Sequence, residues 1–519
     1  MLAELGEVPA IPTEDAHLQP RPDHGVDLAG HGHNEGRLAT AVGTQDGHVL
    51  AGSDAEVDIV QDDAVAARYV DSAEFEKVAC AGFHRICHFA PQGAEKRTDR
   101  PNPPVRLNGL TIMSDASRFL IPHGFRFGAT KAGLKKSGRT DFAVIVADSP
   151  ASAAAAFTSN RVTAAPLIVD KENLTASGGR VRVTAINAGN ANCAVGEPGL
   201  AAARATCAAA AQTFGCKPEE VFPSSTGIIG VPLPAEKLIA ALPGLAASLG
   251  SEFDRFQQVA QAILTTDTVE KTAFARFETE GPEGSREVRI AALGKGSGMI
   301  HPQLVPHATM LVYVLTDAAI EPADLQNYLN QSIELSFNRI SVDGDTSTND
   351  TVLLLASGAG AAKIEGGNAE FANALTQVCT SLAKQVVADG EGITHVVELQ
   401  VAGAASDADA LRIAKAIAHS PLVKTAWAGK DPNWGRLMAA IGYSGAQVDP
   451  NRIDIRFGNL QICRDGGRAP EFDEGAAHAY VSQPNFSISI DLHQGSGSCV
   501  FWTTDLTVEY VHINADYSS

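Results

Sequence analysis

A loop rich in glycine and proline ends at a threonine that could act as a nucleophile. The segment Gly294–Thr316 reads GKGSGMIHPQLVPHATMLVYVLT, so a flexible stretch leads to Ala308–Thr309 just before an apolar strand. The Thr309 hydroxyl could attack the preceding carbonyl carbon, and an N-to-O acyl shift followed by hydrolysis would split the chain. The new N-terminal amine, with an ordinary pKa of about 7.7–8.0, could then serve as general base for the Thr309 hydroxyl. Taken alone, the pattern is also typical of a loop threonine that opens a strand.

Three further polar turns carry groups that could assist acyl transfer. Residues Phe222–Gly230 read FPSSTGIIG, a turn that could stabilise an oxyanion with its N–H groups and hydroxyls, or cap a helix. Residues Thr265–Lys271 read TTDTVEK, where hydroxyls beside an acid could bind a substrate ammonium or carboxylate, or form an exposed helix cap. Residues Ala388–Thr394 read ADGEGIT and place Glu391 at the end of a helix dipole that disfavours an acid. That carboxylate could bind a substrate ammonium, or be a surface loop acid.

Two more stretches could form a metal-binding or catalytic site, but each also fits a purely structural role. Residues Val342–Val352 read VDGDTSTNDTV, with Asp343 and Asp345 on either side of a glycine. The glutamate that ends a calcium-binding EF-hand loop is missing, so we predict a hydrogen-bonded turn without metal. Residues Leu422–Leu437 read LVKTAWAGKDPNWGRL, a shaped loop that could pack against its surroundings or take part in catalysis.

The composition favours a large globular protein that acts on small molecules. The chain has 519 residues, 45% of them hydrophobic, and a net charge of -20, so more than one compact unit is expected. The acidic balance argues against binding to nucleic acid or to anionic membranes. The eight cysteines lack paired CxxC spacing and favour reduced thiols in the cytoplasm over disulfides or a zinc site. We find no apolar run long enough for a membrane span and no signal peptide.

The elements that must position these residues alternate between strands and helices. Strands are predicted at 139–149, 179–187, 286–293, 310–316, 351–356, 395–402, 452–457, 486–492 and 503–511, and helices at 199–214, 235–249 (interrupted at Pro243), 322–339, 368–388 and 407–418. This alternation predicts α/β layers rather than an all-α or all-β protein. Residues 1–112 differ, since they are rich in His, Asp and Gly and run into a polar, Pro-rich linker, so compact order is not expected there.

The motifs, taken together and in this order, resemble the ornithine acetyltransferase (glutamate N-acetyltransferase) family of arginine biosynthesis. The matching stretches are NAGNANCAVG at 187–196, SSTGIIG, TTDT, KGSGMIHP, ATML, DGDTSTNDTVLLL, DGEG, LVKTAWAGKDPNWGR and the terminal NADYSS. The resemblance covers about residue 117 to Ser519, and its specificity comes from the joint occurrence of motifs that are weak singly. It implies an α/β fold, a two-part layered sandwich of helices and sheets of the self-processing aminopeptidase type.

The resemblance also implies how the chain is organised. Autoproteolysis between Ala308 and Thr309 would give an α chain of residues 113–308 and a β chain of residues 309–519 that begins with the nucleophile. A hetero-oligomer of these α and β chains is expected. The family needs no metal or other cofactor for the reaction, and the residues leave open whether acetyl-CoA serves as a second acetyl donor.

Site residues follow from the same resemblance. Thr226 and Gly227 look like the oxyanion hole. The substrate-binding set looks like Thr265, Lys295, Thr309, Glu391, Asn514 and Ser519. The implied reaction is ping-pong transfer of the acetyl group from N2-acetylornithine to glutamate through an acetyl-Thr309 ester. Lys295 can pair with the substrate carboxylate and Glu391 with its ammonium.

Other functions remain as alternatives. A self-cleaving aminopeptidase or amidase of related fold would use the same nucleophile with water as acceptor, but the presence of Lys295, Glu391 and the terminal segment Asn514–Ser519 disfavours it. A protein that has kept the fold as an uncleaved regulatory or assembly unit is a further alternative, which the intact set of motifs argues against.

Two stretches depart from the family pattern. The loop before Thr309 is longer than usual, and Leu304, Val305 and Pro306 look inserted. Residues 1–112 match nothing in the family, whereas Met113 opens a stretch, MSDASRFLIPHGFRFGATKAG, that looks like a family start. We therefore expect residues 1–112 to be a poorly ordered or mis-called N-terminal extension.

Overall fold

The computed structural model describes residues 106–107, 110–111, 121–281, 284–303 and 310–516. These residues all belong to one compact unit, Thr98–Ser519. Nearly all of the segment 1–112 therefore lies outside the described residues, and the expectation of little order there stays a prediction.

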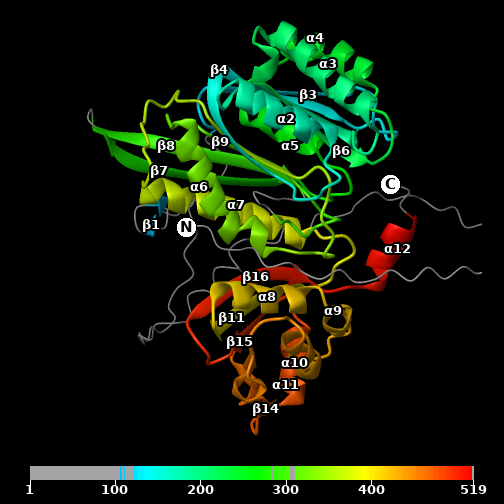
Figure 1. The fold of residues 1–519 in the computed structure, drawn as a ribbon, viewed down its shortest axis with the longest axis vertical. Coiled ribbons are helices and arrows are strands. Elements are labelled where there is room, and N and C mark those ends of the chain that lie inside the picture. The colour runs from blue at the N-terminus through cyan, green and yellow to red at the C-terminus, as the bar shows by residue number, and fades with distance from the viewer. Residues whose placement is uncertain (1–105, 108–109, 112–120, 282–283, 304–309, 517–519) are drawn as a thin grey trace, which may run out of the picture. The chain divides into compact units, whose positions relative to one another are not determined.

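The described strands and helices alternate through the chain (Figure 1). The strands are β1 (Arg106–Leu107), β2 (Leu110–Thr111), β3 (Phe125–Thr130), β4 (Phe142–Phe157), β5 (Arg180–Asn190), β6 (Val221–Ile228), β7 (Lys271–Gly281), β8 (Gly284–Lys295), β9 (Leu311–Thr316), β10 (Thr351–Ala356), β11 (Val396–Ala404), β12 (Asp454–Phe457), β13 (Leu460–Arg464), β14 (Gly467–Arg468), β15 (Asn485–Asp491) and β16 (Gly497–Thr504). The helices are α2 (Ala165–Ala176), α3 (Glu197–Phe214), α4 (Ala235–Ala247), α5 (Phe253–Ala262), α6 (Pro322–Leu335), α7 (Ala369–Ala388), α8 (Asp407–Ala418), α9 (Pro421–Ala428), α10 (Trp434–Gly442), α11 (Glu474–Val481) and α12 (Val508–Asp516).

The larger sheet has two parallel strands near its centre. In the described part of the chain it is eight-stranded, with the order β6-β5-β4-β10-β9-β8-β7 and with β3 paired to β4. β9 and β10 run parallel from Leu311↔Thr351 to Thr316↔Ala356. Every side chain of these two strands is buried, which explains why both read as continuous apolar runs. Parallel strands enter a sheet at the same edge, so the segments that precede β9 and β10 are brought together there.

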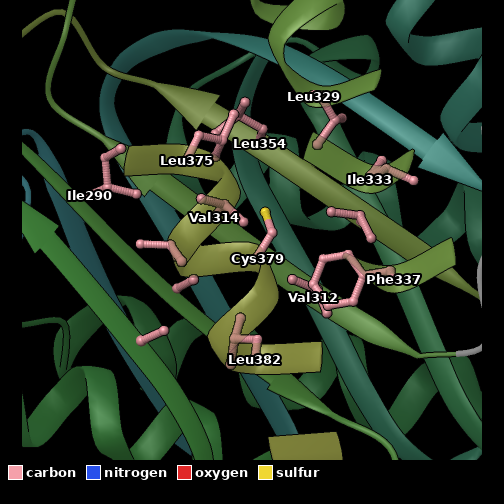
Figure 2. Close-up of a cluster of buried hydrophobic side chains, with 14 of the residues drawn as sticks. Ile290, Val312, Val314, Leu329, Ile333, Phe337, Leu354, Leu375, Cys379 and Leu382 are labelled. Atoms are coloured by element: carbon pink, nitrogen blue, oxygen red, sulfur yellow. The ribbon is translucent and has the colours of Figure 1, made fainter. Parts of the chain in front are cut away.

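Helices α6 and α7 cover one face of this sheet. Their apolar residues recur at helical spacing and pack onto the central strands. Figure 2 shows this core, in which the labelled side chains are Ile290, Val312, Val314, Leu329, Ile333, Phe337, Leu354, Leu375, Cys379 and Leu382. Helix α7 is capped by Asn368, the residue before it, whose side chain accepts a hydrogen bond from the Phe371 N–H at 2.8 Å.

Helices α3 and α4 pack on the first half of β4. Phe142, Val144 and Val146 of that strand share a core with these helices, whereas the intervening Ala143 and Ile145 belong to a second core on the opposite face. This alternation follows from the two-residue period of a strand. Helix α5 contributes side chains to this second core, so helices pack on both faces of the sheet.

A smaller sheet forms the second layered part. Its six described strands have the order β14-β13-β12-β15-β11-β16, and helices α8 to α11 contribute to its own apolar core. Strand β16 joins the two parts, because Trp502 is buried in the core of the larger sheet and bridges to Ile340. The layered α/β class predicted from the sequence is confirmed.

Two predicted elements are partly wrong. Helix α4 continues through Pro243 instead of being interrupted, because this proline lies on the exposed face, where water can satisfy the carbonyl that loses its helical partner. The strand predicted at 503–511 ends at Thr504 and is followed by α12. The Thr507 hydroxyl accepts the N–H of Tyr510 at 3.1 Å and so stabilises the first turn of that helix.

Among the described residues, no helix is both long enough and apolar enough to cross a bilayer.

Replacing Leu375 with alanine tests the core on α7. Leu375 is fully buried, so Leu375→Ala should lower the free energy of unfolding by about 2–5 kcal/mol through lost burial and the cavity left behind. Leu335→Ala on α6 is a matched control, since Leu335 is 54% exposed and should change stability by no more than about 0.5 kcal/mol. Denaturant unfolding followed by circular dichroism measures both, and equal losses would contradict this assignment of the core.

Candidate active site

A cavity of about 250 Å³ collects most of the residues singled out from the sequence. The predicted residues that line it are Thr226, Gly227, Thr265, Lys295, Glu391 and Asn514. Ala308, Thr309 and Ser519 lie outside the described residues. Met310, which follows Thr309 in the chain, also lines the cavity. Segments that are far apart in the sequence therefore converge at the edge of the larger sheet where β9 begins.

The stretch predicted as a polar turn is instead the last part of strand β6, which pairs with β5 through an irregular register at Gly189 and Asn190. The two backbones approach unusually closely there. Gly227 has a φ of 133°, and a Cβ atom there would lie 2.3 Å from the carbonyl carbon of Gly189 on β5. No side chain fits at this position. Asn349 anchors the same strand end, because its Nδ2 donates to the carbonyl oxygens of Ser225 (2.9 Å) and Ala191 (2.6 Å). Thr226 is thereby held on an anchored strand end at the cavity wall.

The start of β9 is anchored to β10. The Met310 carbonyl accepts the N–H of Thr351 at 2.7 Å, and the Met310 residue is 3% exposed. Lys295 is the last residue of β8 and pairs with Leu311, so its side chain enters the cavity beside this anchored strand end. Burial lowers the pKa of the Lys295 ammonium, while the carboxylates of Asp267, Asp350 and Glu391 raise it.

Glu391 is held at the cavity by backbone contacts and by a neighbouring amide. Its N–H donates to the carbonyl of Ser297 at 3.2 Å, and its Oε2 accepts a hydrogen bond from Asn514 Nδ2 at 3.0 Å. The carboxylate occupies space that opens because Gly298 has no side chain, since a Cβ there would lie 2.4 Å from Glu391 Cδ. The glutamate predicted after a long helix is thus nearly buried at the cavity wall, not on an open surface loop.

The C-terminal helix α12 brings Asn514 to this wall. The helix is docked at its start, where the Thr507 hydroxyl donates to the Gly392 carbonyl. A Cβ on Gly392 would lie 2.5 Å from the Tyr510 nitrogen, so the close contact requires glycine. The Tyr510 hydroxyl donates to Asp343 Oδ2 at 3.4 Å. The predicted strand at 503–511 would not have placed Asn514 correctly.

A buried ion cluster beside the cavity was not identified from the sequence. The Lys271 ammonium donates to Asp267 Oδ1 at 2.8 Å and to Asp389 Oδ2 at 2.6 Å. Asp267 and Asp389 belong to the motifs TTDT and DGEG, but Lys271 only ends the segment TTDTVEK, for which substrate binding or an exposed helix cap was predicted. Its partner Asp389 is 118 residues away in the chain, and no local pattern reports a pairing at that separation.

The two stretches with a structural interpretation do support the fold. Asp343 accepts the N–H groups of Met299 (2.7 Å) and Ile300 (2.8 Å), which confirms the hydrogen-bonded turn and fixes the loop that carries Gly298. Burial raises the pKa of Asp343 although these backbone hydrogen bonds oppose the shift. The segment 422–437, predicted as a shaped loop, instead forms most of α9 and the start of α10. Its Lys424 is buried and donates to the carbonyl of Thr504, and burial lowers the pKa of Lys424 to about 8.

Comparisons with known proteins agree with the resemblance seen in the motifs. The model of the ArgJ family matches residues 126–519. The arginine biosynthesis bifunctional protein ArgJ of Geobacter sulfurreducens is 46% identical over 398 residues, which cover 76% of this chain and 98% of that protein. A solved structure of ArgJ from Bacillus halodurans is 45% identical, with a TM-score of 0.39, and covers 40% of this chain and 100% of that chain.

A second solved structure is that of the ornithine acetyltransferase from Mycobacterium tuberculosis complexed with ornithine. It is 33% identical, with a TM-score of 0.31, and covers 36% of this chain and 94% of that chain. Because the family model spans most of the sequence and the first relative is matched along nearly its whole length, the chain belongs to the ArgJ family and is an acetyltransferase of arginine biosynthesis.

Proposed function

We propose that the chain cleaves itself between Ala308 and Thr309 and then transfers the acetyl group of N2-acetylornithine to glutamate through an acetyl-Thr309 ester. One observation carries the proposal. A single cavity is lined by the end of β6 at Thr226, by the cation of Lys295 and by the carboxylate of Glu391. An acetylated diamino acid offers one group to each of these, namely an acetyl carbonyl, a carboxylate and an ammonium.

The nucleophile is proposed to act from the anchored end of β9. Thr309 directly precedes Met310, whose carbonyl is fixed to β10. The Thr309 hydroxyl attacks the acetyl carbonyl carbon, and its own α-amine takes the hydroxyl proton. The tetrahedral oxyanion is stabilised by Thr226 and by the N–H of Gly227, which the anchored end of β6 positions in advance of the reaction.

The charges of the cavity match those of the donor. Lys295 and Glu391 carry opposite charges, and N2-acetylornithine carries an α-carboxylate and a side-chain ammonium with no net charge. We assign the carboxylate to Lys295 and Thr265, and the ammonium to Glu391, with Asn514 and Ser519 completing the substrate contacts. The substrate replaces water around both charges without changing the net charge of the site.

The second half of the reaction returns the enzyme to its starting state. Ornithine leaves once its amine regains a proton, and the amine of glutamate attacks the ester carbonyl carbon. The C–O bond to Thr309 breaks, and N-acetylglutamate and the free hydroxyl form. Acetyl-CoA could form the same acetyl-Thr309 ester in place of N2-acetylornithine. An assay with acetyl-CoA as the acetyl donor decides whether it does.

The organisation of the chain is proposed to follow the cleavage. Residues 113–308 form the α chain, residues 309–519 form the β chain, and the active protein is a hetero-oligomer of the two.

A cytoplasmic location is also proposed for the protein. The described cysteines are free thiols, and burial raises the pKa of Cys379 to about 12, so such thiols stay protonated and suit a reducing compartment.

Cleavage is tested by the intact mass of the purified protein beside a Thr309→Ala variant. The parent should give two chains split before Thr309, and the variant a single chain, because alanine has no hydroxyl to attack the preceding carbonyl. A parent that remains one chain would count against the proposal.

The proposed oxyanion hole is tested by Thr226→Ala, compared with Thr266→Ala as a matched control from the same cavity. Thr226→Ala should lower kcat by about 10²–10³-fold with little change in KM, because the lost interaction strengthens in the transition state. Thr266→Ala should stay close to the parent. Steady-state kinetics with N2-acetylornithine and glutamate measures both, and equal effects of the two substitutions would exclude a specific role for Thr226.

The ammonium site is tested by Glu391→Gln with two donor substrates. With N2-acetylornithine, kcat/KM should fall about 10–100-fold, because a buried charge-assisted contact is lost. With N2-acetylnorvaline, which lacks the ammonium, kcat/KM should stay within about twofold of the parent, since no such contact exists to lose. Glu365→Gln, in an exposed ion pair with Lys363, is the control. Similar losses with both donors would argue that Glu391 has another role.

A further inference from the structure

The buried lysine of the ion cluster lies where two loops of the cavity meet. Lys271 is the first residue of β7 and is fully buried. Its ammonium donates to one carboxylate from each loop, Asp267 and Asp389, and to the carbonyl of Val269 at 3.2 Å. Burying three charged groups is unfavourable unless the geometry of the pairing is nearly fixed. The cluster therefore sets the separation of the two loops.

The first loop leads from Asp267 to the groups proposed to bind the substrate carboxylate. Asp267 Oδ2 accepts the N–H of Thr265 at 3.1 Å and lies 3.5 Å from its hydroxyl. Asp267 Oδ1 accepts the N–H of Gly296, the neighbour of Lys295, at 2.6 Å. Burial favours the neutral acid, but the charges of Lys295 and Lys271 outweigh it and hold the pKa of Asp267 below its ordinary value.

The second loop leads from Asp389 to the group proposed to bind the substrate ammonium. Asp389 also contacts the first loop directly, because it accepts the N–H of Thr268 at 3.0 Å and the hydroxyl of the same residue. Its backbone carbonyl accepts the Ser297 hydroxyl at 2.6 Å, and the Ser297 carbonyl accepts the N–H of Glu391 at 3.2 Å. A change in the position of Asp389 would therefore be passed to Glu391.

We infer that Lys271 is a positioning residue that fixes the distance between Lys295 and Glu391, and so selects the length of the donor between its carboxylate and its ammonium. The inference rests on the proposed function. Without the cation, two buried carboxylates repel each other and the loops that carry the substrate-binding groups relax apart. A misplacement of about 1 Å can lower a rate about 10²-fold. The donor selected is an N2-acetylated diamino acid with three methylenes before its ammonium.

A positioning role and a purely structural role predict different kinetics. If Lys271 only stabilises the fold, its loss lowers the amount of active protein and reduces the rates with all donors by one common factor. If it sets a distance, the rate falls most with the donor of matching length and least with longer or shorter homologues. The ratio of kcat/KM values between donors does not depend on the amount of active protein, so it separates the two roles.

The experiment compares Lys271→Met with Lys363→Met in the full-length protein. Lys363 belongs to an exposed ion pair with Glu365, so its loss controls for removing a lysine. The donors are N2-acetylornithine, N2-acetyllysine and N2-acetyl-2,4-diaminobutyrate, with intact mass used to verify cleavage of each variant. Lys271→Met should lower the preference for N2-acetylornithine over both homologues about 10-fold or more, mainly through KM. Lys363→Met should keep the parent's preference within about twofold.

Asp389→Asn provides a milder second variant. It keeps an oxygen that can accept from Thr268 but removes the charge that pairs with Lys271, so it should shift the preference in the same direction by about 3–10-fold. It decides the question if Lys271→Met gives no soluble protein. A parent-like preference in a soluble, cleaved variant, or an equal loss with all three donors, would overturn the inference.

The failure of the proposed function would look different. If the parent transfers no acetyl group from N2-acetylornithine, the proposed function is wrong. The role of Lys271 in fixing the distance between Lys295 and Glu391 can then be tested by binding alone. Calorimetric titration of the parent and of Lys271→Met with ornithine and with lysine then gives the readout. A preference for ornithine that shrinks in Lys271→Met supports the positioning role, and an unchanged ratio of affinities overturns it.

Discussion

The parallel pairing of β9 with β10 at the centre of the larger sheet determines where the other parts of the cavity lie. Both strands are buried on two faces, so a slip in register would exchange residues between two filled cores and is strongly disfavoured. Leu311 pairs with Thr351 on one side and with Lys295 on the other. Lys271 in turn pairs with Gly294. One edge of the sheet thus collects the cation of the cavity, the buried lysine and the start of the strand after Thr309.

Close backbone contacts position the remaining groups of the cavity. Gly227 lets β6 approach β5 beside Thr226, Gly298 leaves room for the Glu391 carboxylate, and Gly392 lets α12 dock beside it. Each of these contacts is shorter than any side chain would allow. The motifs SSTGIIG, KGSGMIHP and DGEG therefore contain glycines whose role is to admit a neighbouring atom. In SSTGIIG and DGEG the polar residue of the cavity directly precedes that glycine.

Much of the fold could be predicted where local patterns decide structure, and less where tertiary contacts do. The strand at Thr351–Ala356 and the helix at Asp407–Ala418 have the predicted limits, because apolar runs and helical spacing report burial directly. The helix through Pro243 and the helix at Val508–Asp516 could not be predicted, since exposure and a capping contact decide them. The joint motifs indicated the residues that line the cavity, whereas the pairing of Lys271 with Asp389 depends on the folded chain alone.

The strand order of the larger sheet has a consequence for how long the protein survives. Strands β9 and β10 lie between β4 and β8, so a break before Thr309 would leave two central strands from one fragment clamped between strands of the other. Neither fragment could leave without opening hydrogen bonds on both sides and exposing the cores above and below. Dissociation would then be as slow as global unfolding, and the lifetime of the nicked protein would be set by kinetic stability, with no covalent link needed.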